Sequence, residues 1–96
     1  MLVVVSYDVS TKDPEGPKRL RRVAKACVDF GQRVQNSVFE CNVEPEQWTR
    51  LKLRLLGVFD PDSDSLRFYF LGSNFRRRIE HYGAKAPVDM EAPLLL

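Results

Sequence analysis

The chain has 96 residues, enough for one domain with a single hydrophobic core and too few for a second domain. Hydrophobic residues make up 44% of the chain and charged residues 29%, a balance that excludes an intrinsically disordered protein. The formal net charge of +2 does not by itself indicate a nucleic-acid-binding protein, but basic residues gather in two clusters, at Lys18–Lys25 and Arg76–Arg78.

The first predicted element is a strand at Leu2–Val9, where apolar and mostly β-branched residues occupy both alternating faces. Such a strand lies in the centre of a sheet and is covered on both faces. After a polar loop, apolar residues recur at helical spacing over Pro17–Phe30, and a proline suits the first turn of a helix. The charged residues of this predicted helix share its other side, so its outer face is basic.

The segment Arg33–Val43 has the composition of a strand, but its apolar residues do not keep to one alternating face. A break at Asn36 and Ser37, residues that tolerate turns and bulges, would divide it into two short strands. The second of these strands would then bury Phe39 and Cys41 on one face.

Pro45 opens a second predicted helix, which ends near Gly57. Its apolar face consists of Trp48, Leu51, Leu55 and Phe59. A polar loop separates this helix from a strand at Ser65–Leu71, in which large apolar side chains alternate with an arginine and a tyrosine. The segment Phe75–Tyr82 alternates again, and it is predicted to form an additional strand or arm.

This order of elements predicts an α+β fold of the ferredoxin-like βαββαβ type, with both helices on one face of the sheet. We expect residues 1–82 to form this domain and residues 83–96 to form a C-terminal tail. The opposite face of the sheet also carries apolar residues, which need cover. We therefore expect a homodimer packed through its sheets, in which the segment from Phe75 onward adds to the sheet edge of the partner.

The two cysteines, Cys27 and Cys41, lie at apolar positions and lack the spacing of a metal site, so we expect them to be reduced core residues. The N-terminal sequence has no basic leader, and its apolar run breaks at Ser6, too early to span a bilayer. The expected location is the cytoplasm, without membrane association.

Asp8 is the residue most suggestive of chemistry, because it ends an apolar central strand. Its side chain could cap the following loop through the amides of Ser10 or Thr11, and the residues alone favour this structural role. Alternatively, Asp8 binds a divalent cation, with a second carboxylate supplied across a two-fold axis. Two carboxylates about 4 Å apart would repel by about 4 kcal/mol at an effective dielectric of about 20, which a bridging cation or a shared proton would relieve.

The basic clusters and the single histidine also allow more than one interpretation. A charged helix face is usually only solvated, yet both clusters and their symmetry copies could form a stripe that follows a phosphate backbone. The residues of this hypothesis are Lys18, Arg19, Arg22, Arg76, Arg77 and Arg78. We interpret His81 as structural, because it lacks a second ligand and because metal-activated water can replace a histidine base.

Four segments resemble the Cas2 family of CRISPR-associated endonucleases. They are LVVVSYDV at residues 2–9, KRLRRVAK at 18–25, GQRVQNSVFEC at 31–41 and DSLRFYFLG at 64–72. The resemblance extends from Leu2 to about Leu71, and EHYGAK at residues 80–85 resembles a subgroup of the family.

The resemblance implies a ferredoxin-like homodimer in which Asp8 is the catalytic residue and binds Mg²⁺, or Mn²⁺, at the dimer axis. It further implies cleavage of RNA or double-stranded DNA, and a place in spacer acquisition beside the CRISPR-associated integrase, which performs the transesterification. The residues that lie in family segments for nucleic-acid contact or cleavage are Arg19, Arg22, Arg33 and Phe39.

Two other functions stay open at this point. A DNA-binding scaffold subunit of the spacer integration complex would need no catalysis, and Asp8 would then be structural. A toxin-type ribonuclease resembling virulence-associated protein D shares the fold class. An RNA-recognition motif has the same topology, but SVFECNV at residues 37–43 lacks its glycine-bearing aromatic signature.

Overall fold

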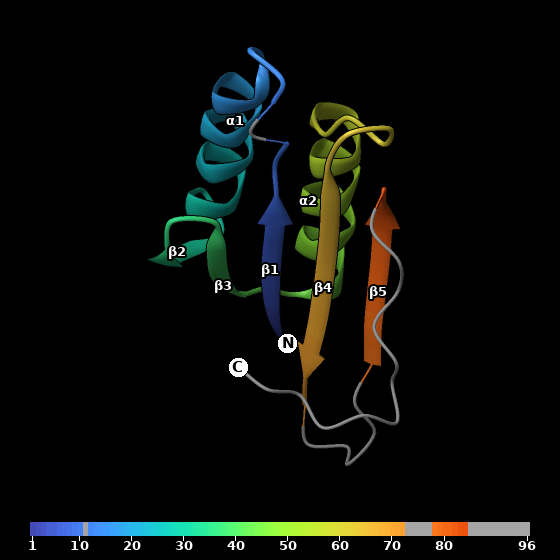
Figure 1. Cartoon of the computed structure of the whole chain (residues 1–96). Helices are drawn as coiled ribbons and strands as arrows, with labels where there is room; N and C mark the ends of the chain where they lie inside the picture. Colours follow the sequence, from blue (N-terminus) through green and yellow to red (C-terminus); the bar gives the residue numbers. More distant parts are fainter. Residues whose placement is uncertain (11, 73–77, 85–96) are drawn as a thin grey trace.

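The computed structural model describes residues 1–10, 12–72 and 78–84, which form the five strands and two helices of Figure 1. In chain order these are β1 (Leu2–Asp8), α1 (Gly16–Val28), β2 (Gly31–Gln35), β3 (Val38–Asn42), α2 (Pro45–Val58), β4 (Ser65–Leu71) and β5 (Arg78–Gly83). The strands form one antiparallel sheet in the order β2-β3-β1-β4-β5, and both helices cover the same face (Figure 1). The predicted ferredoxin-like fold with an additional strand is confirmed.

The strand β1 lies in the centre of the sheet, as its two apolar faces predicted. Val5 pairs with Phe39 of β3 on one side and with Phe68 of β4 on the other. Val3, Val5 and Tyr7 are buried beneath the helices, whereas the residues between them lie on the opposite face, because side chains alternate along a strand.

The helix α2 places its apolar side on the sheet. The Trp48 ring meets two rings of β4 edge-on, with centroids 4.8 Å from Phe68 and 5.4 Å from Phe70. Leu51 and Leu55 lie on the same face of the helix and are fully buried. The predicted apolar face of this helix is therefore confirmed, and its fourth member, Phe59, is half-buried just beyond the helix end.

The observed ends of the helices reflect their capping residues. A proline stands in the first turn of each helix, as expected from its fixed backbone angle. Glu44 and Gln47 form a reciprocal capping box at the start of α2. The helix α1 ends at Val28, before the predicted end at Phe30, because the Phe30 amide donates instead to the Cys27 carbonyl at 3.0 Å.

The predicted division of the segment 33–43 at Asn36 and Ser37 is confirmed by a turn between β2 and β3. The pairing of these strands is irregular between Arg33 and Gln35, which explains why the apolar residues do not keep to one face. The Arg33 guanidinium donates to the backbone oxygen of Asn36 within the turn. The edge strand β2 is exposed along its whole length.

Cys27 and Cys41 are buried and reduced, as predicted, and the Cys41 thiol donates to the Cys27 carbonyl at 3.6 Å. The contact with Cys41 and burial raise the pKa of the Cys27 thiol, so this thiol stays protonated at neutral pH. Within the part of the chain that the structure describes, no helix is long and apolar enough to cross a membrane.

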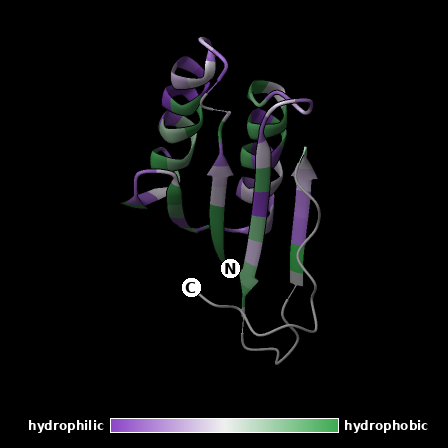
Figure 2. Cartoon of the chain, in the orientation of Figure 1, coloured by the Kyte–Doolittle hydropathy of each residue, from purple (hydrophilic) through white to green (hydrophobic). Residues whose placement is uncertain are grey.

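On the other face of the sheet, the residues described here provide no covering helix (Figure 1). Leu2 and Val4 of β1 are partly buried on this face, and Leu71 of β4 is 47% exposed. Figure 2 shows that β1 is hydrophobic at its start and hydrophilic at its end. The dimer expected to cover this face stays a prediction. The segment from Phe75 onward is predicted to extend the sheet of the partner, but its described part, β5, pairs with β4 of the same chain. The tail expected at residues 83–96 lies outside the described residues from position 85 onward.

Candidate functional site

Asp8 is the last residue of β1, and its side chain is exposed. In the sheet it lies opposite Ser65, the first residue of β4. Alternation along the strand places its side chain on the face opposite to that of Tyr7, away from the helices. The loop that follows β1 and the loop that precedes β4 meet at this end of the sheet, so the strand end that carries Asp8 is held between them.

Asp64 lies beneath this strand end and is fully buried, with 0% of its surface exposed. Its carboxylate accepts hydrogen bonds from the hydroxyl of Tyr7, from the Ser10 amide at 3.2 Å and from the Asp60 amide at 3.1 Å. A buried carboxylate is costly unless its oxygens are hydrogen-bonded and its charge is paired. These donors satisfy the first requirement.

The second requirement is met by Arg19 on α1. Its Nε lies 2.7 Å from Oδ2 of Asp64 and its Nη2 lies 3.0 Å from Oδ1, which is the bidentate geometry of a strong ion pair. The same Nη2 also lies 2.9 Å from Oδ2 of Asp13 in the loop before α1. Arg19 therefore joins the first helix to both loops at the end of β1.

These contacts alter the acidity of their members. Burial raises the pKa of Asp64, but hydrogen bonds from Arg19 and Tyr7 outweigh this effect and lower the pKa to about 2. Burial and the hydrogen bond to Asp64 raise the pKa of the Tyr7 phenol. The hydrogen bond to Asp64 is the main cause that raises the pKa of Arg19. At neutral pH, Asp64 is thus ionised, Arg19 is charged and Tyr7 keeps its proton.

The sequence-based expectation for Asp8 included a capping role through nearby amides. The Ser10 amide donates to Asp64, 54 positions away in the chain. Thr11 lies outside the described residues. The end of β1 is therefore tied to a residue of a distant loop, which local capping rules do not predict.

The basic residues predicted to contact nucleic acid do not all have the same role. Lys18 and Arg22 are exposed on α1, and their spacing of four residues places them on one side of the helix. Arg19 lies between them in sequence, but only 12% of its side chain is exposed, because it points to Asp64. Two of the three predicted residues of this helix are thus available to a phosphate backbone.

Phe39, which the family resemblance placed in a segment for nucleic-acid contact or cleavage, offers no exposed surface in this chain. Its ring is fully buried between the sheet and the helices, because its position on β3 shares the buried face with Cys41. The guanidinium of Arg33 lies 5.5 Å from the centre of the Phe39 ring, a cation–π distance. Arg33 is exposed, and its guanidinium packs on the buried Phe39 ring.

The second basic cluster falls largely outside the described residues, which do not include Arg76 and Arg77. Arg78 begins β5, where its backbone pairs with Phe70 of β4. His81, on the same strand, accepts hydrogen bonds at Nδ1 from Nε and Nη2 of Arg67, both at 3.3 Å. A histidine with a cationic neighbour does not form the carboxylate–histidine pair typical of a general base. This contact supports the structural interpretation of His81.

A divalent cation at Asp8 requires further oxygen ligands. Within residues 1–10, 12–72 and 78–84, there is no group of three or more His, Cys, Asp or Glu side chains that could hold a metal ion. Magnesium is often bound by only one or two carboxylates, with waters and substrate phosphates at its other positions. An exposed Asp8 therefore fits one ligand position of a site whose other ligands are waters, substrate phosphates or a carboxylate of a second copy.

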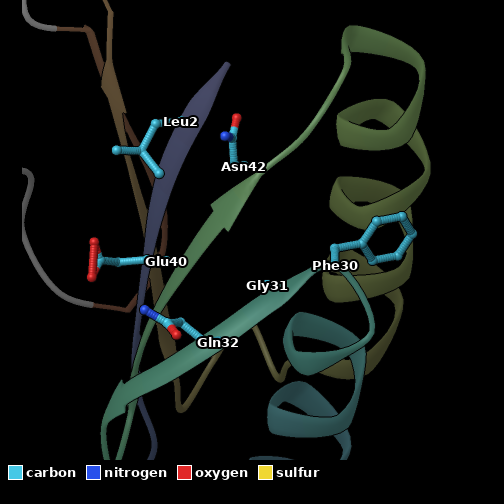
Figure 3. A pocket seen from close by; sticks show the side chains of 6 residues that line it. All are labelled: Leu2, Phe30, Gly31, Gln32, Glu40 and Asn42. Atoms are coloured by element: carbon cyan, nitrogen blue, oxygen red, sulfur yellow. The ribbon is translucent and has the colours of Figure 1, made fainter.

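A shallow pocket of about 360 Å³ lies at the other end of β1 (Figure 3). Its lining residues are Leu2, Phe30, Gly31, Gln32, Glu40 and Asn42. Figure 3 shows Leu2 and Glu40 pointing to the same side of the sheet, with Phe30 towards the helices. The length of β1, roughly 20 Å at about 3.3 Å per residue, separates this pocket from Asp8. The pocket is thus distinct from the candidate site.

Sequence reasoning missed Asp64 as a member of the site. One signal was available, because Tyr7 shares its strand face with Val3 and Val5, and a buried tyrosine hydroxyl usually has a hydrogen-bond partner. That argument predicts an acceptor beneath the end of β1. It does not identify which of the acidic residues of the following segments supplies it.

Comparison with known proteins agrees with the fold and with the sequence motifs. The family model for CRISPR associated protein Cas2 matches residues 1–79. A CRISPR-associated endoribonuclease Cas2 of Chlorobaculum tepidum is 62% identical over the full length of both chains. A CRISPR-associated endonuclease Cas2 of Halalkalibacterium halodurans is 56% identical over 99% of each chain. The crystal structure of Streptococcus pyogenes Cas2 is similar with a TM-score of 0.72 and 59% identity, over 78% of this chain and 90% of that chain. The chain therefore belongs to the Cas2 family of CRISPR-associated proteins.

Proposed function

We propose that the chain is a divalent-metal-dependent endonuclease that hydrolyses phosphodiester bonds of RNA or double-stranded DNA, with Asp8 as metal ligand. The observation that carries this proposal is the placement of Asp8, an exposed carboxylate at the end of a central strand whose neighbours are tied to Asp64. The names of similar proteins, endoribonuclease and endonuclease, support a nuclease activity.

In this proposal, each part of the site has a separate task. A bound Mg²⁺ or Mn²⁺ ion would stabilise the charge that develops on the reacting phosphate. Asp8 holds the ion with its carboxylate. Lys18 and Arg22, exposed on α1, bind phosphates of the backbone and fix the register of the nucleic acid without reading its sequence.

The proposal includes a homodimer, because the described residues of one chain contain no group of three or more potential metal ligands. Two copies packed through the open face of the sheet would cover Leu2, Val4 and Leu71. Each copy would contribute one Asp8 to the shared site. We further propose that this dimer works in the cytoplasm, in spacer acquisition, together with the CRISPR-associated integrase.

The deciding experiment compares the wild type with Asp8→Asn on labelled RNA and on duplex DNA, with Mg²⁺ and with EDTA. The substitution removes ligand charge at nearly constant shape, so it should abolish metal-dependent cleavage and leave the dimer intact in sedimentation. Asp62→Asn is the matched control, because Asp62 is an exposed carboxylate in the loop before β4. Undiminished cleavage by purified Asp8→Asn would contradict the proposal.

The exposed basic side chains of Lys18 and Arg22 on α1 support a second candidate function, a DNA-binding scaffold of the spacer integration complex. A scaffold needs the basic surface but not the ion. The same assays separate the two functions. A scaffold would bind duplex DNA with equal affinity in Mg²⁺ and in EDTA, and neither the wild type nor Asp8→Asn would cleave it.

A further inference from the structure

We propose that Asp64 is a positioning residue, which sets the orientation of Asp8 by fixing the backbone on both sides of it. This inference rests on the proposed function, because it concerns the geometry of the same site. It adds a residue of the loop before β4, 56 positions beyond Asp8 in the sequence, to the parts that the reaction would need.

The contacts of Asp64 support this role directly. Of the five donors to its carboxylate, two belong to the residues that flank Asp8. The Tyr7 hydroxyl donates from the position before Asp8, and the Ser10 amide donates from two positions after it. The two contacts fix the course of the chain immediately before and after Asp8.

Asp64 can position Asp8 without contacting the carboxylate oxygens of Asp8, because the side chains of Tyr7 and Asp8 lie on opposite faces of the sheet. Tyr7 points into the core, and Asp8 points to the opposite face of the sheet. A carboxylate below the strand can therefore hold Tyr7, while Asp8 remains exposed above. The register adds a further link, because Asp8 pairs with Ser65, the residue that directly follows Asp64.

A positioning residue must itself be held, and Asp64 is held both by α1 and by its own loop. Arg19 of α1 binds both of its oxygens, and the amide of Asp60 binds Oδ2 from the loop before β4. Its side chain is fully buried, so water does not compete for these hydrogen bonds. Groups that orient a metal ligand in this way commonly change metal affinity or activity about 10- to 100-fold when they are removed.

The test uses the full-length protein and three variants. Asp64→Asn removes the charge, weakens the hydrogen bonds to the oxygen that remains and abolishes those at the position of its NH2 group, which cannot accept. Tyr7→Phe removes one donor while keeping the Arg19 ion pair. Leu55→Ala is the control for lost stability, because Leu55 of α2 is a fully buried core residue whose side chain makes no hydrogen bond to the carboxylate. All proteins are assayed well below their melting temperatures.

Three readouts are compared. The first is the Mg²⁺ concentration that half-saturates cleavage, which we expect to rise about 10-fold or more in Asp64→Asn and by a smaller factor in Tyr7→Phe. The second is Mn²⁺ binding without nucleic acid, followed by electron paramagnetic resonance, which should weaken in parallel. The third is hydrogen exchange of the Ser10 amide, which should become faster in Asp64→Asn. Leu55→Ala should match the wild type in the two metal readouts.

The outcomes separate this inference from the proposed function. If Asp8→Asn abolishes cleavage while folded Asp64→Asn and Tyr7→Phe keep the wild-type Mg²⁺ dependence and Mn²⁺ binding, Asp64 does not position Asp8, and the nuclease proposal stands. If Leu55→Ala changes the metal readouts as much as Asp64→Asn does, the effect is general destabilisation, and the positioning role is overturned. If Asp8→Asn cleaves as the wild type does, both proposals are wrong.

Discussion

The guanidinium of Arg19 donates to both oxygens of the buried Asp64 carboxylate, from Nε to Oδ2 at 2.7 Å and from Nη2 to Oδ1 at 3.0 Å. This pair joins the first helix to the loop before β4, beneath the strand end that carries Asp8. The positive charge of Arg19 is therefore directed into the protein. Its neighbours Lys18 and Arg22 keep their charges at the surface.

Arg19 and Arg22 should respond differently to the same substitution. Arg19→Ala leaves the Asp64 charge buried without its partner, so we expect a clear fall in the denaturant concentration at the unfolding midpoint. Arg22→Ala should change stability by no more than about 0.5 kcal/mol, because Arg22 is exposed. Urea titration of both variants measures this difference. Equal midpoints would show that the Arg19 pair contributes nothing to stability.

Salt titration of nucleic-acid binding tests whether Arg22 contacts the phosphate backbone. Each phosphate contact contributes about 0.9 to the slope of log affinity against log salt. Replacing Arg22 in both copies of a dimer should flatten that slope by up to about 1.8. A wild-type slope in Arg22→Ala would identify this residue as ordinary solvated surface.

Acid should destabilise the protein through Asp64. The folded-state pKa of Asp64 is about 2, below the ordinary value of 3.8, so the unfolded chain binds this proton more readily than the folded chain does. The stabilisation is complete above about pH 5 and is lost as the pH falls through about 2. Since each pKa unit corresponds to about 1.4 kcal/mol, the loss should be about 2 kcal/mol. Chemical denaturation from neutral to acidic pH measures it, and Asp64→Asn should lack this part of the pH dependence.

Two glycines should respond in opposite directions to alanine. Gly83 at the end of β5 has a φ of +119°, and a Cβ there would overlap the backbone of Asp64 and lie 2.8 Å from Cα of Ser65. The backbone angle alone should cost roughly 1–3 kcal/mol in Gly83→Ala. Gly57 in α2 has nothing within 4 Å of such a Cβ, so Gly57→Ala should stabilise by about 0.5–1 kcal/mol. Thermal unfolding of the two variants compares them, and a shift of the same sign in both would contradict this explanation.

Most of the fold could be predicted from local patterns. The apolar residues on both faces of β1 indicated its central place, and the tolerant residues Asn36 and Ser37 indicated the turn between β2 and β3. In each case the residue type limits either the backbone conformation of its own segment or how far that segment can be exposed to water. Such restrictions can be recognised without knowing what packs against them.

The candidate site was only partly predictable, because its geometry depends on distant segments. The position of Asp8 at a strand end followed from the sequence, but the role of Asp64 depends on donors from β1, α1 and two loops. Phe39 shows a second limit. Its alternation on β3 correctly predicted a buried ring, whereas the resemblance to a family suggested a role in nucleic-acid contact or cleavage, for which the buried ring offers no exposed surface.

The hydrogen bonds of Asp64 join residues 57, 54 and 45 positions apart in the sequence. Contacts over such separations form only after the intervening chain has been ordered, because loop closure costs entropy before the contact forms. In a chain where α1 has not yet packed on the sheet, Asp64 lacks Arg19 and must remain hydrated, which prevents the strand end from closing over it. The buried charge therefore favours the complete topology, in which Arg19 pairs with Asp64, over partly assembled ones.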